Sequence, residues 1–149
     1  YHDMENILKS TSVAAIHVRR GDYIKIASQV GLLSAEYYRR AIKVAKDFGI
    51  RKFLIHSDSP SLAYEMLKDE LPSDSIWFGD GLSSAEILKQ MSLCNFLIIS
   101  NSSFSYWSAM WASSEHNNII APSKWFRNEI DPGDLLPKNW IATEPQWIN

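Results

Sequence analysis

The chain has 149 residues, of which 46% are hydrophobic and 21% charged, a composition typical of a globular domain with one core. Its formal net charge of -2 excludes a broad basic surface for nucleic acid or acidic lipid, so any anion site must be local. The single cysteine, Cys94, excludes an internal disulfide framework and is expected to be a small buried residue in a reducing compartment.

The N-terminal segment YHDMENILKSTS lacks the basic region and the apolar core of a signal peptide. No apolar run approaches the roughly 18 residues of a membrane-spanning helix. The expected location is therefore the cytoplasm, including peripheral contact with the inner face of the membrane. The chain starts at Tyr1 without Met, which indicates a piece of a longer protein.

Apolar runs rich in β-branched residues alternate with helical patterns along the chain. The runs predict strands at residues 12–18, 52–56, 95–100 and 118–122, with a weaker strand at 75–79. The helical patterns cover residues 34–49, 59–71, 83–94 and 102–115. This alternation predicts an α/β fold, a mostly parallel sheet with helices on both faces, in one domain spanning residues 1–149.

Two helices and the C-terminal segment carry further signals. Ser83 and Glu86 have the spacing of a capping box, which favours a structural role for Glu86. In the fourth helix Phe104, Trp107 and Trp111 lie on one face. Residues 123–149 are rich in Pro and Trp without a clean period, and we expect an extended tail that packs its aromatic side chains on the body.

The loop after the first strand contains HVRRGDY, residues 17–23. Strand alternation places His17 and Arg19 on one face, with Arg20 on the other. A guanidinium binds phosphate through two charge-assisted hydrogen bonds, Gly21 allows close backbone approach, and Asp22 can pair with one arginine. The alternative is a surface salt-bridge cluster at a turn. The RGD adhesion signal is disfavoured because this triplet directly follows a buried strand.

Two further loops follow predicted strands, and in open α/β sheets ligands bind at the carboxyl ends of the strands. Asp58 in HSDSP can accept hydrogen bonds from a base or a ribose, or simply serve the turn before the next helix. Ser102 and Ser103 in SNSSF form either an anion site at a helix N-terminus or an ordinary cap. Together with the arginines, these loops favour a nucleotide diphosphate as ligand.

Metal and classical nucleotide motifs are missing from the sequence. The histidines are scattered, and the sequence has no DxD, Walker A or GxGxxG pattern. If a diphosphate binds here, arginine and backbone groups are expected to neutralise it without Mg²⁺.

The segments HVRRGDY, FLIHSDS and MSLCNFLIISNSSFSYWSAMW, in this order and spacing, resemble the three motifs of the α-1,2-fucosyltransferases, glycosyltransferase family eleven. The resemblance covers residues 12–126. It implies a GT-B architecture of two Rossmann-like domains, this chain being the C-terminal, donor-binding one and the N-terminal acceptor domain being missing. It also implies GDP-fucose as donor, inversion at the anomeric carbon, a galactose-containing glycan as acceptor, and no metal cofactor.

The resemblance assigns roles to individual residues. Arg19 would contact the β-phosphate, supported by Arg20 and Asp22, and these three are the expected catalytic residues. His17 and Asp58 would lie near guanosine, and the turn 101–104 would hold phosphate. The full expected donor-binding set is His17, Gly21, Tyr23, Asp58, Glu86, Asn101, Ser102, Ser103 and Phe104.

The sequence departs from the family pattern at one position. Family members carry an acidic residue shortly before the MSLC segment, where this chain has Ile87, with Glu86 beside it. No base for the acceptor hydroxyl is identified, although Asp22 is a candidate. Two other hypotheses stay open: a non-catalytic nucleotide-binding or interaction module, and a transferase that uses another nucleotide sugar.

Overall fold

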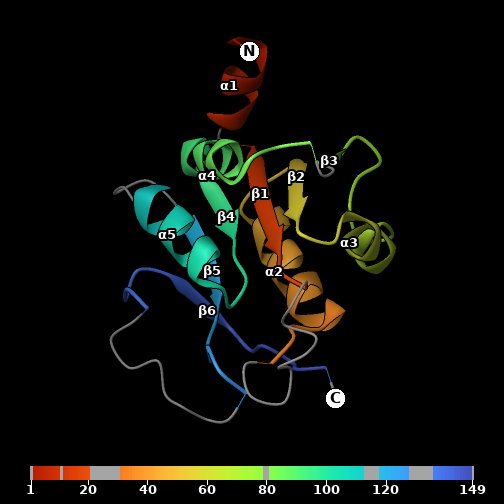
Figure 1. Cartoon of the computed structure of the whole chain (residues 1–149), viewed down its shortest axis with the longest axis vertical. Helices are drawn as coiled ribbons and strands as arrows, with labels where there is room; N and C mark the ends of the chain where they lie inside the picture. Colours follow the sequence, from red (N-terminus) through yellow and green to blue (C-terminus); the bar gives the residue numbers. More distant parts are fainter. Residues whose placement is uncertain are drawn as a thin grey trace.

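A six-stranded sheet forms the centre of the computed structural model, which describes residues 2–10, 12–20, 31–78, 81–112, 118–127 and 136–148 (Figure 1). The strands are β1 (Val13–Val18), β2 (Lys52–Ser57), β3 (Ile76–Trp77), β4 (Phe96–Ile98), β5 (Asn118–Pro122) and β6 (Ile141–Thr143). Their order is β3-β2-β1-β4-β5-β6, and each neighbouring pair is parallel. This is the order of the Rossmann fold, so the predicted fold class is confirmed.

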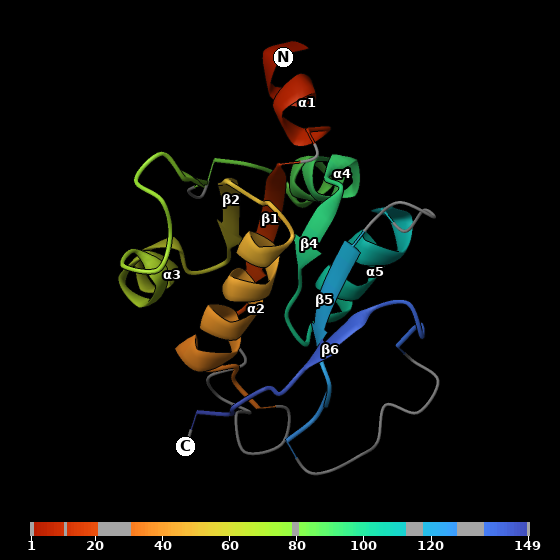
Figure 2. The ribbon, with the colours of Figure 1, turned by 180° about the vertical axis from the view of Figure 1, so that it is seen from behind.

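Helices cover both faces of the sheet (Figures 1 and 2). They are α1 (His2–Leu8), α2 (Ala35–Asp47), α3 (Pro60–Leu67), α4 (Ser84–Leu93) and α5 (Ser103–Ala112). Side chains of α2 and α3 pack with Ala14, Ile16 and Val18 in one core cluster. Side chains of α1, α4 and α5 pack with Val13 and Ala15 in the other. All six residues of β1 are buried, as expected for a central strand with a helix layer on each side.

The helix α5 meets the sheet through small side chains. Its buried residues are Ser105, Ser108, Ala109 and Ala112, whereas Trp107 and Trp111 are 61% and 72% exposed. Phe104, predicted to share a face with these two tryptophans, is half-buried at the start of α5, with its ring 5.3 Å from that of His17. The small residues allow the start of α5 to approach the end of β1 closely.

Two tyrosines of α2 donate hydrogen bonds to carbonyl groups at the ends of the central strands. Both side chains are buried. The hydroxyl of Tyr37 donates to the carbonyl of Ile99 at 2.6 Å, and that of Tyr38 to the carbonyl of His17 at 3.3 Å. Because the pairing of β1 with β4 ends at Ile16 and Ile98, carbonyls beyond this point need donors from outside that pair of strands.

The C-terminal segment contributes an element that the sequence did not predict. Residues 141–143 form β6, which pairs in parallel with β5. The rings of Trp125 and Trp140 are buried, with centroids 5.9 and 5.7 Å from that of Tyr106 on α5. Within the described residues, no helix combines the length and apolar character required to cross a bilayer.

We predict that Tyr37→Phe lowers the free energy of unfolding by about 1 to 3 kcal/mol, because the buried carbonyl of Ile99 loses its 2.6 Å hydrogen bond. The measurement is urea unfolding. Tyr38→Phe is the matched control and should cost less, since its bond to the His17 carbonyl is 3.3 Å long. Equal losses in the two variants would contradict this account.

Candidate functional site

The carboxyl ends of β2, β1 and β4 lie side by side and bring three loops to one edge of the sheet. These loops carry residues 17–20, 56–58 and 100–104. His17 and His56 are register partners on adjacent strands. The candidate site is therefore assembled by the sheet from segments that are distant in the sequence, at the edge where ligands bind in this class of fold.

Asp58 connects the loop after β2 to both arginines. Its carboxylate accepts a hydrogen bond from the backbone N–H of Arg20 at 2.8 Å and lies 3.5 Å from Nε of Arg19. Both partners of the ion pair are about three-quarters buried, with side chains 28% and 23% exposed. The carboxylate thus restrains the Arg19 side chain, which stays in partial contact with solvent at the strand ends.

The side chains of Arg19 and Arg20 contact different parts of the structure. Nη2 of Arg20 contacts Sδ of Met66, at the end of α3, at 2.7 Å. Arg19 instead pairs with Asp58 at the strand ends. Of the two guanidinium groups, that of Arg19 is therefore the better placed for an anion, whereas Arg20 serves packing against α3. The proposed catalytic roles of both stay predictions.

Hydrogen bonds of buried polar side chains stabilise the turn between β4 and α5. Ser102 Oγ accepts the backbone N–H of Ser105 at 3.0 Å, which caps α5. The buried side-chain amide of Asn101 donates to the carbonyls of Gly31 and Trp125, both at 3.2 Å. Ser103 is exposed at the first position of α5. Asn101 and Ser102 therefore shape the turn, and Ser103 is the residue that presents its hydroxyl to solvent.

His17 is buried at the end of β1 and belongs to a cluster of hydroxyl groups. Its Nδ1 is hydrogen-bonded to Ser105 Oγ and lies 3.2 Å from Ser100 Oγ. Burial, followed by the nearby His56 and Arg19, lowers the pKa of His17 to about 3. The imidazole is therefore neutral at physiological pH.

His56 lies at the candidate site beside His17, and sequence reasoning did not single it out. It is fully buried and stacks on Phe78, with ring centroids 4.4 Å apart and planes 8° from parallel. Among the described residues, neither ring nitrogen has a hydrogen-bond partner, and burial lowers its pKa to about 4. Its position in the sequence could have indicated it, because His17 and His56 are each the penultimate residue of a parallel strand, β1 and β2.

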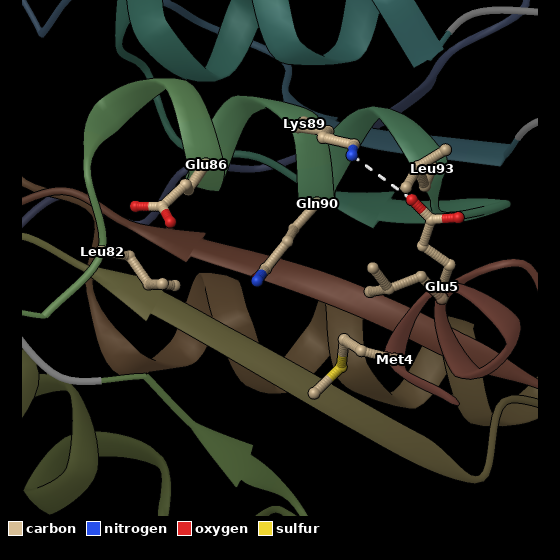
Figure 3. Close-up of a pocket in the computed structure, with 8 residues that line it drawn as sticks. Met4, Glu5, Leu82, Glu86, Lys89, Gln90 and Leu93 are labelled. Atoms are coloured by element: carbon tan, nitrogen blue, oxygen red, sulfur yellow. Dashed lines mark ion pairs between the residues drawn. The ribbon is translucent and has the colours of Figure 1, made fainter. Parts of the chain in front are cut away.

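Glu86 makes its described contacts away from these loops. Its carboxylate accepts from the backbone N–H of Ser83 at 2.7 Å and from Ser83 Oγ at 2.8 Å, which completes the predicted capping box. These bonds hold the pKa of Glu86 below its ordinary value. Glu86 also lines a cavity of about 270 Å³ between α1 and α4, together with apolar side chains such as Met4 and Leu82 (Figure 3). The structure thus gives Glu86 a capping role, and a donor contact stays a prediction.

Three predicted site residues, Gly21, Asp22 and Tyr23, lie outside the described residues. The structure brings together Arg19, Arg20 and Asp58 in one group. In another, the ring of His17 lies beside that of Phe104, and Ser102 is connected to His17 through Ser100 and Ser105. Both groups stand on neighbouring strands of one sheet edge.

A parallel sheet of this order, with helices on both faces, defines the Rossmann-like class of α/β protein. Residues 3–144 match the model of glycosyl transferase family 11, and the chain belongs to that family. The resemblance seen in the sequence motifs is thereby confirmed.

Two curated relatives from Escherichia coli are similar to the chain. An alpha-1,2-colitosyltransferase is 30% identical in a 149-residue alignment that covers 95% of this chain and 51% of the relative. The O-antigen biosynthesis glycosyltransferase WbnK is 30% identical over 139 residues, which cover 91% of this chain and 46% of the relative. The chain therefore spans about half the length of the curated relatives it matches.

We predict that the two buried histidines make the protein less stable in acid. The unfolded chain takes up a proton on each near pH 6.5, whereas the folded pKa values are about 3 and 4. The unfolded state thus binds more protons, and each histidine lowers the free energy of unfolding by about 1.4 kcal/mol per pH unit as pH falls from 6.5 towards 4.

The check is urea unfolding between pH 4.5 and 7.5 with His56→Phe. This variant removes one titrating group without breaking a described hydrogen bond and keeps an aromatic ring against Phe78. Between about pH 5 and 6 its pH slope should be shallower than that of the unsubstituted protein by up to about 1.4 kcal/mol per pH unit, and above pH 7 the two slopes should coincide. Identical slopes in the acidic range would show that His56 is protonated in the folded state or exposed.

Proposed function

We propose that this chain is the donor-binding part of an inverting, metal-independent α-1,2-fucosyltransferase that transfers L-fucose from GDP-fucose to a galactose hydroxyl of a glycan. Membership of glycosyltransferase family 11 supports a nucleotide-sugar donor and a glycan acceptor. The observation that carries the proposal is the placement of Arg19, oriented by Asp58, on the same sheet edge as the turn that begins α5.

The chemistry requires positive charge where the diphosphate departs. In an inverting transfer the acceptor hydroxyl oxygen attacks the anomeric carbon from the face opposite the phosphate and releases its proton, while the C–O bond to the phosphate breaks with its electron pair leaving on GDP. A guanidinium offers two donors to the phosphate oxygens on which this charge develops. Fixed donors of this kind lower the barrier, and loss of one typically costs about 10²- to 10³-fold in rate.

A second candidate is colitosyl transfer from GDP-colitose. It is favoured by the similarity to the alpha-1,2-colitosyltransferase, which extends over 95% of this chain. Colitose is fucose without its 3-hydroxyl, so both donors present the same diphosphate to Arg19. The two candidates differ in the groups that face the sugar ring, and activity with each donor distinguishes them.

The acceptor is proposed to be contacted mainly by residues beyond these 149, since the relatives are about twice as long as the part that this chain matches. For the whole enzyme we propose a cytoplasmic location at the inner face of the membrane, where a glycan precursor is accessible. A non-catalytic nucleotide-binding module is the rival hypothesis. It predicts weak or absent GDP binding and no transfer by a full-length protein containing this chain.

We predict that the chain binds GDP and GDP-fucose more tightly than UDP, with and without EDTA, in isothermal titration calorimetry. Arg19→Ala should weaken GDP binding at least about tenfold, since a charge-assisted phosphate contact is lost. In a full-length protein, transfer should fall by about 10²- to 10³-fold. Arg51→Ala is the matched control, because Arg51 is exposed and precedes β2, at the opposite end of that strand.

Each outcome decides a separate part of the proposal. Tighter binding of UDP than of GDP would overturn the donor assignment. Loss of GDP binding in EDTA would overturn metal independence. Equal affinity in Arg19→Ala and Arg51→Ala would remove Arg19 from the phosphate site.

A further inference from the structure

Ser105, which no motif argument singled out, is the centre of the hydrogen-bond network around His17. It lies in the first turn of α5 and is fully buried. Its Oγ contacts Nδ1 of His17, accepts the backbone N–H of Ser100 at 3.3 Å, and lies 2.9 Å from Ser100 Oγ. Its backbone N–H donates to Ser102 Oγ at 3.0 Å. One hydroxyl thus joins β1, the end of β4 and the start of α5.

The number of hydrogen atoms in this network favours one position for the His17 proton. Ser100 donates its hydroxyl hydrogen to Ser102 Oγ at 3.4 Å. The 2.9 Å contact between Ser100 and Ser105 needs one hydrogen between its oxygens, which must then come from Ser105. Ser105 then has no second hydrogen for the imidazole, which favours a ring proton on Nδ1 that is donated to Ser105 Oγ, with Ser100 Oγ 3.2 Å away as a second acceptor. If Ser105 instead donated to Nδ1, Ser100 would have to donate to Ser105, and the Ser100 hydrogen would no longer be available for Ser102.

The tautomer decides whether Nε2 of His17 accepts or donates a hydrogen bond. A neutral imidazole with its proton on Nδ1 presents a lone pair at Nε2 and accepts hydrogen bonds there. Burial keeps the ring uncharged at physiological pH. A phosphate oxygen has no hydrogen to donate to such an atom. The matching group is an O–H or N–H of the ligand, which a nucleotide sugar carries on its base, its ribose and its sugar ring.

We propose that Ser105 is a positioning residue that holds His17 as the Nδ1–H tautomer, so that Nε2 accepts a hydrogen bond from an O–H or N–H group of the donor nucleotide sugar. The ligand part of this proposal rests on the proposed function. The tautomer part concerns the protein alone, so the two can fail separately.

The first test measures the tautomer without ligand. Nitrogen-15 NMR of histidine-labelled protein distinguishes the two neutral forms by their ring nitrogen shifts, and His17→Gln identifies the His17 signal. The expected result is the Nδ1–H form, unchanged between pH 5 and 8. An Nε2–H form, or titration near pH 6.5, would overturn the proposal whatever nucleotide the protein binds.

The second test compares two buried serines of α5. Ser105→Ala should mix the His17 tautomers and weaken nucleotide binding about tenfold in calorimetry. Ser108→Ala is the matched control, because Ser108 is equally buried and donates to the carbonyl of Phe104 within its own helix at 2.8 Å. It should leave the His17 spectrum and the nucleotide affinity unchanged.

The choice of ligand locates the donating group. If the base or ribose donates to Nε2, Ser105→Ala weakens GDP and GDP-fucose equally. If the fucose ring donates, only GDP-fucose is weakened. Unchanged affinity for both would overturn the positioning role. Failure of the unsubstituted protein to bind either nucleotide would count against the proposed function and the ligand contact, while the NMR result would still decide the tautomer.

Discussion

The hydrogen bonds donated to backbone carbonyl groups at the carboxyl ends of β1 and β4 are the constraint on which the rest of this sheet edge depends. At this point the sheet order changes direction, and the pairing of the two strands ends at Ile16 and Ile98. Carbonyl groups that cannot pair along the sheet must find donors elsewhere, or burial becomes costly. Tyr37 and Tyr38 supply donors from α2, and Ser57 donates to the carbonyl of Val18 at 2.7 Å. The loops that carry the candidate site therefore start from fixed positions.

The electrostatics of the edge follow from this arrangement. The chain has a formal net charge of -2, so attraction of an anion depends on local groups. Asp58 partly neutralises Arg19 and also receives the N–H of Arg20. The carboxylate thus reduces the net positive charge but restricts the guanidinium to fewer orientations, which favours a directional phosphate contact over a diffuse one.

Much of the fold could be predicted from the sequence because a buried parallel strand needs a continuous apolar run. The runs at 12–18, 52–56 and 118–122 match β1, β2 and β5 within a residue or so. The strand β6 has only three residues, Ile141–Thr143, and its short run cannot be distinguished from an extended tail. The helix α1 has seven residues, and packing of Leu8 in the second core cluster stabilises it more than local propensity does.

The candidate site was predictable to the extent that it lies directly on strand ends. Arg19 and Asp58 each follow an apolar run, so the rule for open α/β sheets places them on one edge. The contacts of Ser105 could not be predicted, since they depend on how closely α5 approaches β1. That approach is set by Ala109 and Ala112, small residues that sequence patterns treat as ordinary helix formers. The pairing of His56 with Phe78 likewise depends on the neighbouring strand β3, whose two residues carry little signal.

Four of the six tryptophans fall into two optical classes as a result of this packing, whereas Trp77 and Trp147 are partly buried against the first core cluster. Trp125 and Trp140 are buried beside Tyr106, whereas Trp107 and Trp111 stand in solvent on the outer face of α5. Buried indoles emit at shorter wavelengths and are protected from soluble quenchers, and exposed indoles have the opposite properties. The intrinsic fluorescence therefore contains two separable signals. The short-wavelength emission of Trp125 and Trp140 reports the integrity of the core. Quenching of Trp107 and Trp111 by soluble quenchers reports whether a binding partner covers the outer face of α5.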